Sequence, residues 1–196
     1  ENPYVLIGLH VPKLAKVDGD RDVYALEVLS AVLSADENGR FVRDIVRGSR
    51  VANQASAGYD MTSRGPVLFL LSGVPAEGRS TADVEQAMLA QIARIAREGV
   101  DERELRRVKT QYVAGQIYSR DSMMAQAQEI AGMEMSGFTY RDIDRLLENI
   151  RSVTSDELKA VAGKYFGDDG MTAVTLLPQP IEPRRAPAGA GATRHN

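Results

Sequence analysis

Two histidines are the only imidazole ligands that this 196-residue chain could offer to a metal ion, and cysteine is absent. His10 ends a β-rich stretch near the start of the chain, and His195 is the penultimate residue. A catalytic zinc ion normally needs three protein ligands, yet neither histidine belongs to a local His-Glu-His cluster. We therefore expect no metal and no other cofactor to be bound by this chain alone, and we interpret His10 as a strand-end residue.

Nucleophilic catalysis has no stronger support in the sequence. Without cysteine there is no thiolate nucleophile, and no G-x-S-x-G stretch supplies a serine elbow. The carboxylates of "DGDRD" (18–22) lack the distal glutamate of a calcium loop, so capping of the following helix explains them better. No Gly-rich stretch matches a phosphate-binding loop. These absences predict a folded domain without catalytic residues of its own.

One stretch gathers polar groups that could contact a substrate, "RDIVRGSRVANQASAGYD" at residues 43–60. Here Arg47, Arg50, Asn53 and Tyr59 surround the junction between a basic helix end and an alternating strand. Guanidinium and amide donors at such a junction can bind peptide carbonyls or carboxylates. The alternative is that exposed positions at a helix end and along one side of a strand are usually polar. The residues alone leave both interpretations open.

The composition is that of an ordinary globular domain. Hydrophobic residues make up 43% and charged residues 26%, which is enough for a core at this length. A net charge of −3 and a pI of about 5.5 give no strong basic field for nucleic acid or anionic lipid. No apolar run approaches the ~20 residues of a membrane span. The chain starts directly in a strand pattern, so we expect an excised domain or a processed product.

The hydrophobic pattern predicts a strand, two helices, two strands, a helical block and a last strand. Their ranges are 3–11, 20–34, 40–48, 51–61, 65–75, 80–166 and 170–177. Strands and helices segregated in this way predict an α+β fold, with a mainly antiparallel sheet and helices packed on one face. This domain spans residues 1–177, and residues 178–196, rich in Pro, Ala and Gly, are predicted to be a disordered tail.

Two apolar segments carry more detailed expectations. The unbroken run "GPVLFLLSGVP" is typical of a strand covered on both faces, which predicts Leu68 and Leu70 in the core with Phe69 and Leu71 largely buried. The segment "MMAQAQEIAGMEM" holds four of the seven methionines. It is predicted to pack in the core, with an adaptable binding face as the alternative.

Four stretches taken in order carry a resemblance to a known family. They are "DRDVYALEVLSAVLSADENGRFVRDIVRGSRVANQASAGYD", "GPVLFLLSGVP", "AREGVDERELRRVKTQYVAGQ" and "IRSVTSDELKAVAGKYF". Their order and spacing resemble the C-terminal domain of M16 zinc peptidases, the relatives of insulinase, pitrilysin and mitochondrial processing peptidase. The resemblance covers residues 3–177.

The resemblance implies a pair of similar α+β domains that enclose a chamber, where extended peptides bind by strand addition. The N-terminal M16 domain carries H-x-x-E-H, whose glutamate activates water at zinc, so zinc is expected in the full-length protein. The C-terminal domain usually lacks that motif, as this chain does. The implied partners are that N-terminal domain, a second M16 subunit in paired-subunit relatives, and an extended peptide. Bacterial relatives of the paired kind are often exported, which implies a periplasmic location.

Many relatives place an arginine and, seven residues later, a tyrosine at the opening stretch of the C-terminal domain. Aligning "RVANQAS" with the family's "RGLAYSV" puts Val46 at the arginine position and Asn53 at the tyrosine position. Both positions depart from the family pattern, and Arg47 lies one residue away from the expected arginine. The resemblance thus implies that Arg47, Arg50, Asn53 and Tyr59 contact substrate in the chamber without being catalytic.

Two functions follow from the resemblance. The first is the C-terminal domain of an M16-type zinc metalloendopeptidase, which hydrolyses peptides only together with its zinc-bearing domain. The second is a non-catalytic M16-like scaffold or partner subunit of a heteromeric complex. An H-x-x-E-H sequence upstream of Glu1 would favour the first.

Overall fold

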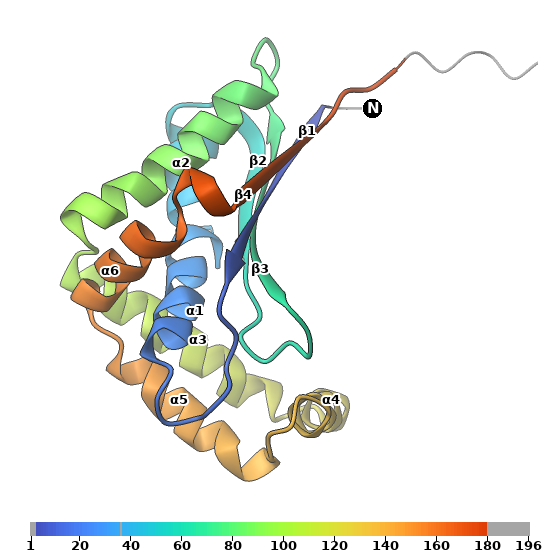
Figure 1. Cartoon of the computed structure of the whole chain (residues 1–196), viewed down its shortest axis with the longest axis vertical. Coiled ribbons are helices and arrows are strands. Elements are labelled where there is room, and N and C mark those ends of the chain that lie inside the picture. Colours follow the sequence, from blue (N-terminus) through green and yellow to red (C-terminus); the bar gives the residue numbers. More distant parts are fainter. Residues whose placement is uncertain (1–2, 36, 180–196) are drawn as a thin grey trace, which may run out of the picture.

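The computed structural model describes residues 3–35 and 37–179. Its four strands form one antiparallel sheet in the order β2-β3-β1-β4, so that β2 and β4 are the edge strands. The strands are β1 (Tyr4–Val11), β2 (Ala52–Gly58), β3 (Val67–Pro75) and β4 (Met171–Leu176). The helices that pack on this sheet all lie to one side of it (Figure 1). The predicted α+β class, with an antiparallel sheet and helices on one face, is confirmed.

Three helices pack directly against the sheet, namely α1 (Arg21–Ser34), α2 (Thr81–Glu98) and α6 (Ser155–Tyr165). Behind α1 lie α3 (Glu102–Ser119) and α5 (Ile143–Ser152), while α4 (Met123–Met135) lies near the lower end of the sheet in Figure 1. A π-helical segment, η1 (Phe41–Gly48), leads into β2. Short 3-10 turns, η2 (Tyr140–Asp142) and η3 (Asp168–Gly170), precede α5 and β4.

The helix boundaries follow local capping chemistry. Thr154 and Glu157 form a reciprocal capping box at the start of α6. Within the predicted helical block, the chain breaks at Ser119–Ser122, where the Ser122 side chain accepts the Ala125 N–H at 3.3 Å and starts α4. The stretch from Glu102 to Met135 therefore forms two helices.

The start of α3 has only half of a reciprocal capping box. The Asp101 carboxylate accepts the backbone N–H groups of Arg103 and Glu104, as expected of a cap. The Glu104 side chain, however, accepts from the buried guanidinium of Arg40 at 2.7 Å. The ion pair joins α3 to the start of η1, because a charged guanidinium is a stronger hydrogen-bond donor to the carboxylate than a local backbone N–H.

The core lies between the sheet and the helices. Val5, Ile7 and Leu9 of β1 alternate toward α1, α2 and α6 and are fully buried, as are Phe69 and Leu71 of β3. Period-two burial along both central strands means that only one face of the sheet belongs to the core.

The prediction that Leu68 and Leu70 are core residues is wrong, whereas the burial of Phe69 and Leu71 is confirmed. Leu68 and Leu70 point to the other side of β3 and are each 40% exposed. The run is unbroken because both faces of β3 are apolar, but helices cover only one of them.

The methionine-rich helix α4 is also more exposed than predicted. Met133 is buried, but Met123, Met124 and Met135 are among the most exposed apolar side chains of the described residues. Core packing therefore holds for one of the four methionines, because α4 touches the rest of the domain along a narrow stripe.

The predicted domain limit at residue 177 stays a prediction. The last described element is β4, and residues 180–196 of the predicted tail, with His195, lie outside the described residues. Among the helices of the described chain, none is long and apolar enough to cross a bilayer.

Candidate functional site

The four sequence-predicted site residues lie along the segment from η1 through β2. Arg47, in the last turn of η1, donates to the carboxylate of Glu37 at 2.5 Å, and both side chains are largely exposed. A surface ion pair of this kind contributes little to stability. Arg47 is thus partly engaged by an acidic neighbour rather than presented freely to a ligand.

Arg50 connects η1 to β2 in an unusual backbone conformation. Its φ is +52°, which makes it the one non-glycine residue with positive φ in the described chain. The left-handed region costs an L-residue about 1–2 kcal/mol. Its side chain is exposed and makes no hydrogen bond or ion pair within the described residues. The strained link therefore presents a guanidinium to the surroundings.

Asn53 lies in an irregular part of the edge strand. The pairing of β2 with β3 shifts register between Ala52 and Gln54, so Asn53 is the extra residue of a β-bulge. Its Nδ2 donates to the Pro75 carbonyl at 3.3 Å, while the residue as a whole is exposed. Asn53 thus braces the bulge and leaves most of its surface open to solvent.

The side chain of Tyr59 is held by contacts within the fold. Its hydroxyl donates to the Pro12 carbonyl at 2.6 Å, and its ring stacks on Phe69 with 6.0 Å between centroids. Burial raises the pKa of its hydroxyl above the usual value, so the group is neutral at physiological pH.

Three of the four residues therefore share one end of β2, and Tyr59 lies beyond its other end. Six residues of extended chain separate Asn53 from Tyr59, or about 20 Å. The structure brings Arg47, Arg50 and Asn53 together and separates Tyr59 from them. Their role as substrate contacts stays a prediction.

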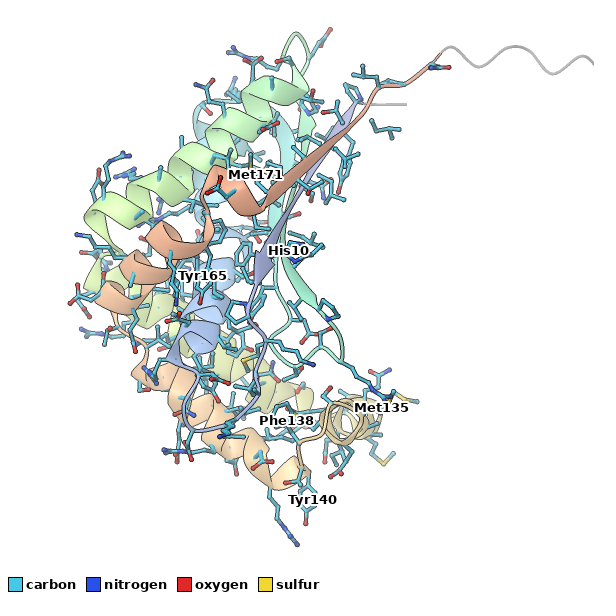
Figure 2. All side chains as sticks on the ribbon, in the orientation of Figure 1. His10, Met135, Phe138, Tyr140, Tyr165 and Met171 are labelled. Carbon is cyan, nitrogen blue, oxygen red and sulfur yellow. The ribbon has the colours of Figure 1, made fainter. Side chains whose placement is uncertain are left out.

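A second surface, which sequence reasoning missed, is the sheet face that no helix covers. We call it the open face. Antiparallel register places Gly8 of β1 between Leu70 of β3 and Thr172 of β4, and it pairs Leu6 of β1 with Val174 of β4. Val174 is 57% exposed and Leu176, further along β4, is 59% exposed. Figure 2 shows His10 on this same side of the sheet, away from the helices.

The open face contains a groove of about 240 Å³. Its lining residues come from the three strands β1, β3 and β4: Leu6, Gly8, His10, Leu68, Leu70, Thr172 and Val174. Gly8 forms its floor, since a Cβ built there would lie 3.3 Å from Leu68 Cδ1 and 3.7 Å from Leu70 Cδ2. A side chain at position 8 would occupy the space between the two leucines.

The sequence did contain a sign of this surface. An apolar residue at every position from Val67 to Leu71 means that both faces of β3 are apolar. The sequence does not say whether the second face meets helices of the same chain or another partner.

The described residues do not fit a zinc site. Within residues 3–35 and 37–179, no three His, Cys, Asp or Glu side chains are grouped so that they could hold a metal ion. Zinc bound elsewhere in a full-length protein stays a prediction.

Solved structures with the same fold come from bacterial proteases and from complex III2 of Candida albicans. The chain is similar to a protease from Helicobacter pylori with a TM-score of 0.81 and 20% identity, covering 90% of this chain and 41% of that one. It is also similar to the inactive peptidase domain of a candidate zinc protease from Bordetella parapertussis, with a TM-score of 0.77 and 17% identity, covering 95% of each chain. A chain of complex III2 from Candida albicans gives a TM-score of 0.70 at 15% identity, with coverage of 89% and 42%. At these identities the likeness shows the fold.

The chain thus spans about two fifths of the Helicobacter pylori protease. No curated protein matches the chain. Residues 1–112 match the family described as "Peptidase M16 inactive domain", and this match covers more than half of the sequence. The chain therefore belongs to the M16 peptidase inactive-domain family.

Proposed function

We propose that this chain is the non-catalytic C-terminal domain of an M16-type zinc metalloendopeptidase and that its open face forms part of the peptide-binding chamber. The observation that carries the proposal is the apolar groove on the open face, lined by Leu68, Leu70 and Val174. Apolar side chains gathered on one uncovered sheet face favour a protein or peptide partner, because burying them releases water.

The length of one similar protein supports the presence of a partner domain. The chain spans 41% of the Helicobacter pylori protease, which leaves room in that protein for a second domain of similar size. The described residues offer no group of metal ligands, so the hydrolytic chemistry would come from a domain that carries H-x-x-E-H. The open face would then contact apolar side chains of an extended peptide, while Arg50 and Asn53 contact its polar groups.

A scaffold role is the second candidate. The observation in its favour is the fold shared with a chain of complex III2 from Candida albicans, 42% of which is covered by this chain. In that case the open face would pack permanently against another subunit, and no peptide would enter.

Peptide hydrolysis by reconstituted protein separates the two functions. The 196-residue chain is mixed with an M16 domain or partner subunit that carries H-x-x-E-H, and cleavage of an extended peptide is followed. The proposal expects no cleavage by either part alone and cleavage by the mixture. A stable complex that contains both parts and zinc but cleaves no peptide would instead support the scaffold.

A further inference from the structure

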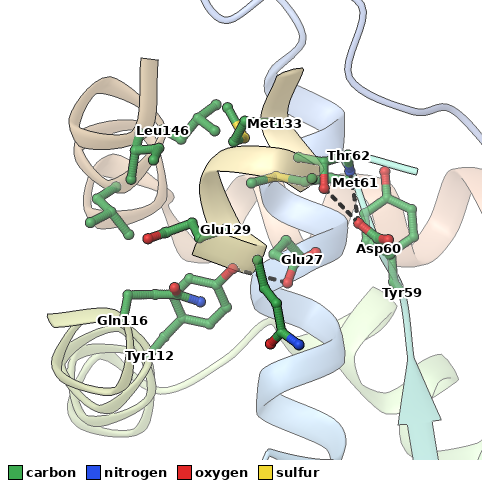
Figure 3. A pocket seen from close by; sticks show the side chains of 14 residues that line it. Glu27, Tyr59, Asp60, Met61, Thr62, Tyr112, Gln116, Glu129, Met133 and Leu146 are labelled. Atoms are coloured by element: carbon green, nitrogen blue, oxygen red, sulfur yellow. Dashed lines mark hydrogen bonds between the residues drawn. The ribbon is translucent and has the colours of Figure 1, made fainter. Parts of the chain in front are cut away.

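A cavity of about 370 Å³ lies on the helical side of the domain, away from the open face. Side chains from α1, α3, α4, α5 and the turn after β2 line it (Figure 3). Three of them are carboxylic acids: Glu27 from α1, Asp60 from the turn and Glu129 from α4. No Lys, Arg or His side chain is among the residues that line the cavity. The cavity is therefore acidic, without a cation of its own.

Glu27 is the most deeply placed of the three acids. Its Oε1 accepts a hydrogen bond from the Tyr112 hydroxyl at 3.1 Å. Its Oε2 is shielded from solvent and has no hydrogen-bond partner of normal geometry among the described residues. A buried carboxylate oxygen without a donor is costly, and a ligand that supplies the donor removes that cost.

The groups around Glu27 do not neutralise it. Burial raises the pKa of Glu27 to about 7, and the charge of Asp60 adds to the effect, whereas the Tyr112 hydroxyl and the Met61 backbone N–H oppose it. Asp60 itself accepts from the backbone N–H and the hydroxyl of Thr62. The cavity therefore contains one carboxylate oxygen without a hydrogen-bond donor, Oε2 of Glu27, and the carboxyl groups of Asp60 and Glu129.

Arg120 is a cation beside the cavity, and it is engaged with a neighbouring acid. It interacts electrostatically with Glu129, but its guanidinium donates to Asp144 at 2.8 Å in a neighbouring depression. Arg120 thus partly offsets the charge of Glu129, whereas no cation is among the groups that shift the pKa of Glu27.

Apolar side chains also line the cavity. Met61, Met133 and Leu146 are among them and are buried, and Ile143 lines the cavity too. A ligand that matches both the acidic and the apolar lining has a positive group carried on an aliphatic stem. A guanidinium fork would need both oxygens of Glu27, and Tyr112 already occupies one of them. A compact ammonium group needs only one.

We propose that this cavity is a binding site for an ammonium group on an aliphatic stem, held by Glu27 Oε2 with Asp60 and Glu129 beside it. The ammonium group can come from the lysine side chain of a peptide or from a free alkylamine, since both have the same chemistry. The site is independent of the proposed role of the open face, because it lies on the other side of the sheet.

The test is a nuclear magnetic resonance titration of the 196-residue chain labelled at its methionine methyl groups. Met61 and Met133 line the cavity, and Met171 in β4 serves as an internal reference. The probes are n-pentylamine, the uncharged n-pentanol, and a blocked Ala-Lys-Ala tripeptide. We expect n-pentylamine to shift the methyl signals of Met61 and Met133 but not that of Met171, and n-pentanol to bind at least about tenfold more weakly.

Substitutions locate the ammonium group. Glu27→Gln keeps the shape of the side chain and should weaken n-pentylamine about tenfold or more. The matched control is Glu134→Gln, which removes an exposed carboxylate of α4 that does not line the cavity. Binding of the tripeptide as well as the amine would assign the site to peptide lysines and amines alike, and binding of the amine alone would assign it to small amines.

A pH series provides a second measurement that needs no variant. The other titratable groups facing Glu27 are Tyr112 from α3, Tyr59 and Asp60 from the end of β2 and its turn, and Glu129 from α4. Burial raises the pKa values of both tyrosines, so they stay neutral between pH 6 and pH 8. Ionisation of Glu27 in this range should raise n-pentylamine affinity by up to about tenfold.

Three results would overturn the site. The first is that n-pentanol binds as tightly as n-pentylamine. The second is that the Glu27→Gln variant folds and binds n-pentylamine as tightly as the unchanged chain does. The third is an absence of methyl shifts at Met61 and Met133 with all three probes.

Discussion

Glu27 is a single residue whose burial lowers the stability of the domain and places a carboxyl group in the cavity. Its raised pKa means that the folded state binds a proton more tightly than the unfolded chain does. Between the unfolded value of about 4.5 and the folded value of about 7, the folded chain holds the extra proton, so stability falls as pH rises. Above pH 7 the full cost of a buried carboxylate is present.

Glu27→Gln should therefore stabilise the domain in a pH-dependent way. Because the amide has no charge to desolvate, we expect the gain in unfolding free energy to be about 2 kcal/mol larger at pH 8 than at pH 5. Urea unfolding of both proteins at the two pH values measures this difference. A gain that is equal at both pH values would mean that Glu27 does not titrate as described.

Arg50 is the second residue with a specific expectation. Arg50→Gly and Arg50→Ala both remove the guanidinium, but only glycine also relieves the left-handed backbone. We expect Arg50→Gly to melt at or above the temperature of the unchanged chain, and both variants to slow peptide turnover in the reconstituted protein.

Thermal melts and initial hydrolysis rates test this expectation, with Arg94→Ala as the control, since Arg94 is an exposed arginine of α2 that pairs with Glu98. If both Arg50 variants cleave peptide at the normal rate, the polar residues at this junction are an ordinary solvated surface.

At the scale of the element, local chemistry was sufficient to predict most boundaries. The capping residues Ser80 and Thr154, the break after Ser119 and the alternation of β1 are all properties of short stretches. The exposure of Leu68 and Leu70 was not predictable in the same way, because it depends on which elements stand above the sheet. The cavity around Glu27 could not be predicted from the sequence either, since its lining comes from five separate segments.

The two faces of β3 should respond differently to truncation. Leu71→Ala removes a fully buried side chain and should cost about 2–5 kcal/mol of unfolding free energy. Leu70, one residue away, has a side chain that is 40% exposed. Leu70→Ala should therefore cost clearly less unfolding free energy, about 1 kcal/mol. Chemical denaturation of the two variants makes the comparison, and equal losses would mean that the open face is covered in solution.

At the scale of the whole molecule, the two faces of the sheet differ. Helices cover one face of the sheet, and the other face keeps an apolar groove. The order of elements allowed the α+β class and the family resemblance to be predicted from sequence, because both depend on local patterns in succession. The predicted site residues were separated by the fold, because Tyr59 turns into the helical side while Arg50 and Asn53 stay at the edge.

The proposed dependence on a zinc-bearing domain gives an expectation for metal binding. The 196-residue chain should bind no stoichiometric zinc at neutral pH, because its two histidines are far apart in sequence and it has no thiol. Titration calorimetry with zinc measures this directly. One tightly bound zinc ion per chain would contradict the proposed dependence on another domain.

The most direct test of the central claim is the hydrolysis of an extended peptide by the reconstituted protein that carries Gly8→Val. Valine fits a β-strand and places its methyl groups between Leu68 and Leu70, so it fills the groove and leaves the core unchanged. Gly163→Ala in α6, where an added Cβ meets no atom within 4 Å, is the control. The account predicts that Gly8→Val melts like the unchanged protein and that its kcat/KM falls about tenfold or more, equal to about 1.4 kcal/mol. Normal folding together with an unchanged kcat/KM would contradict a role of the open face in peptide binding.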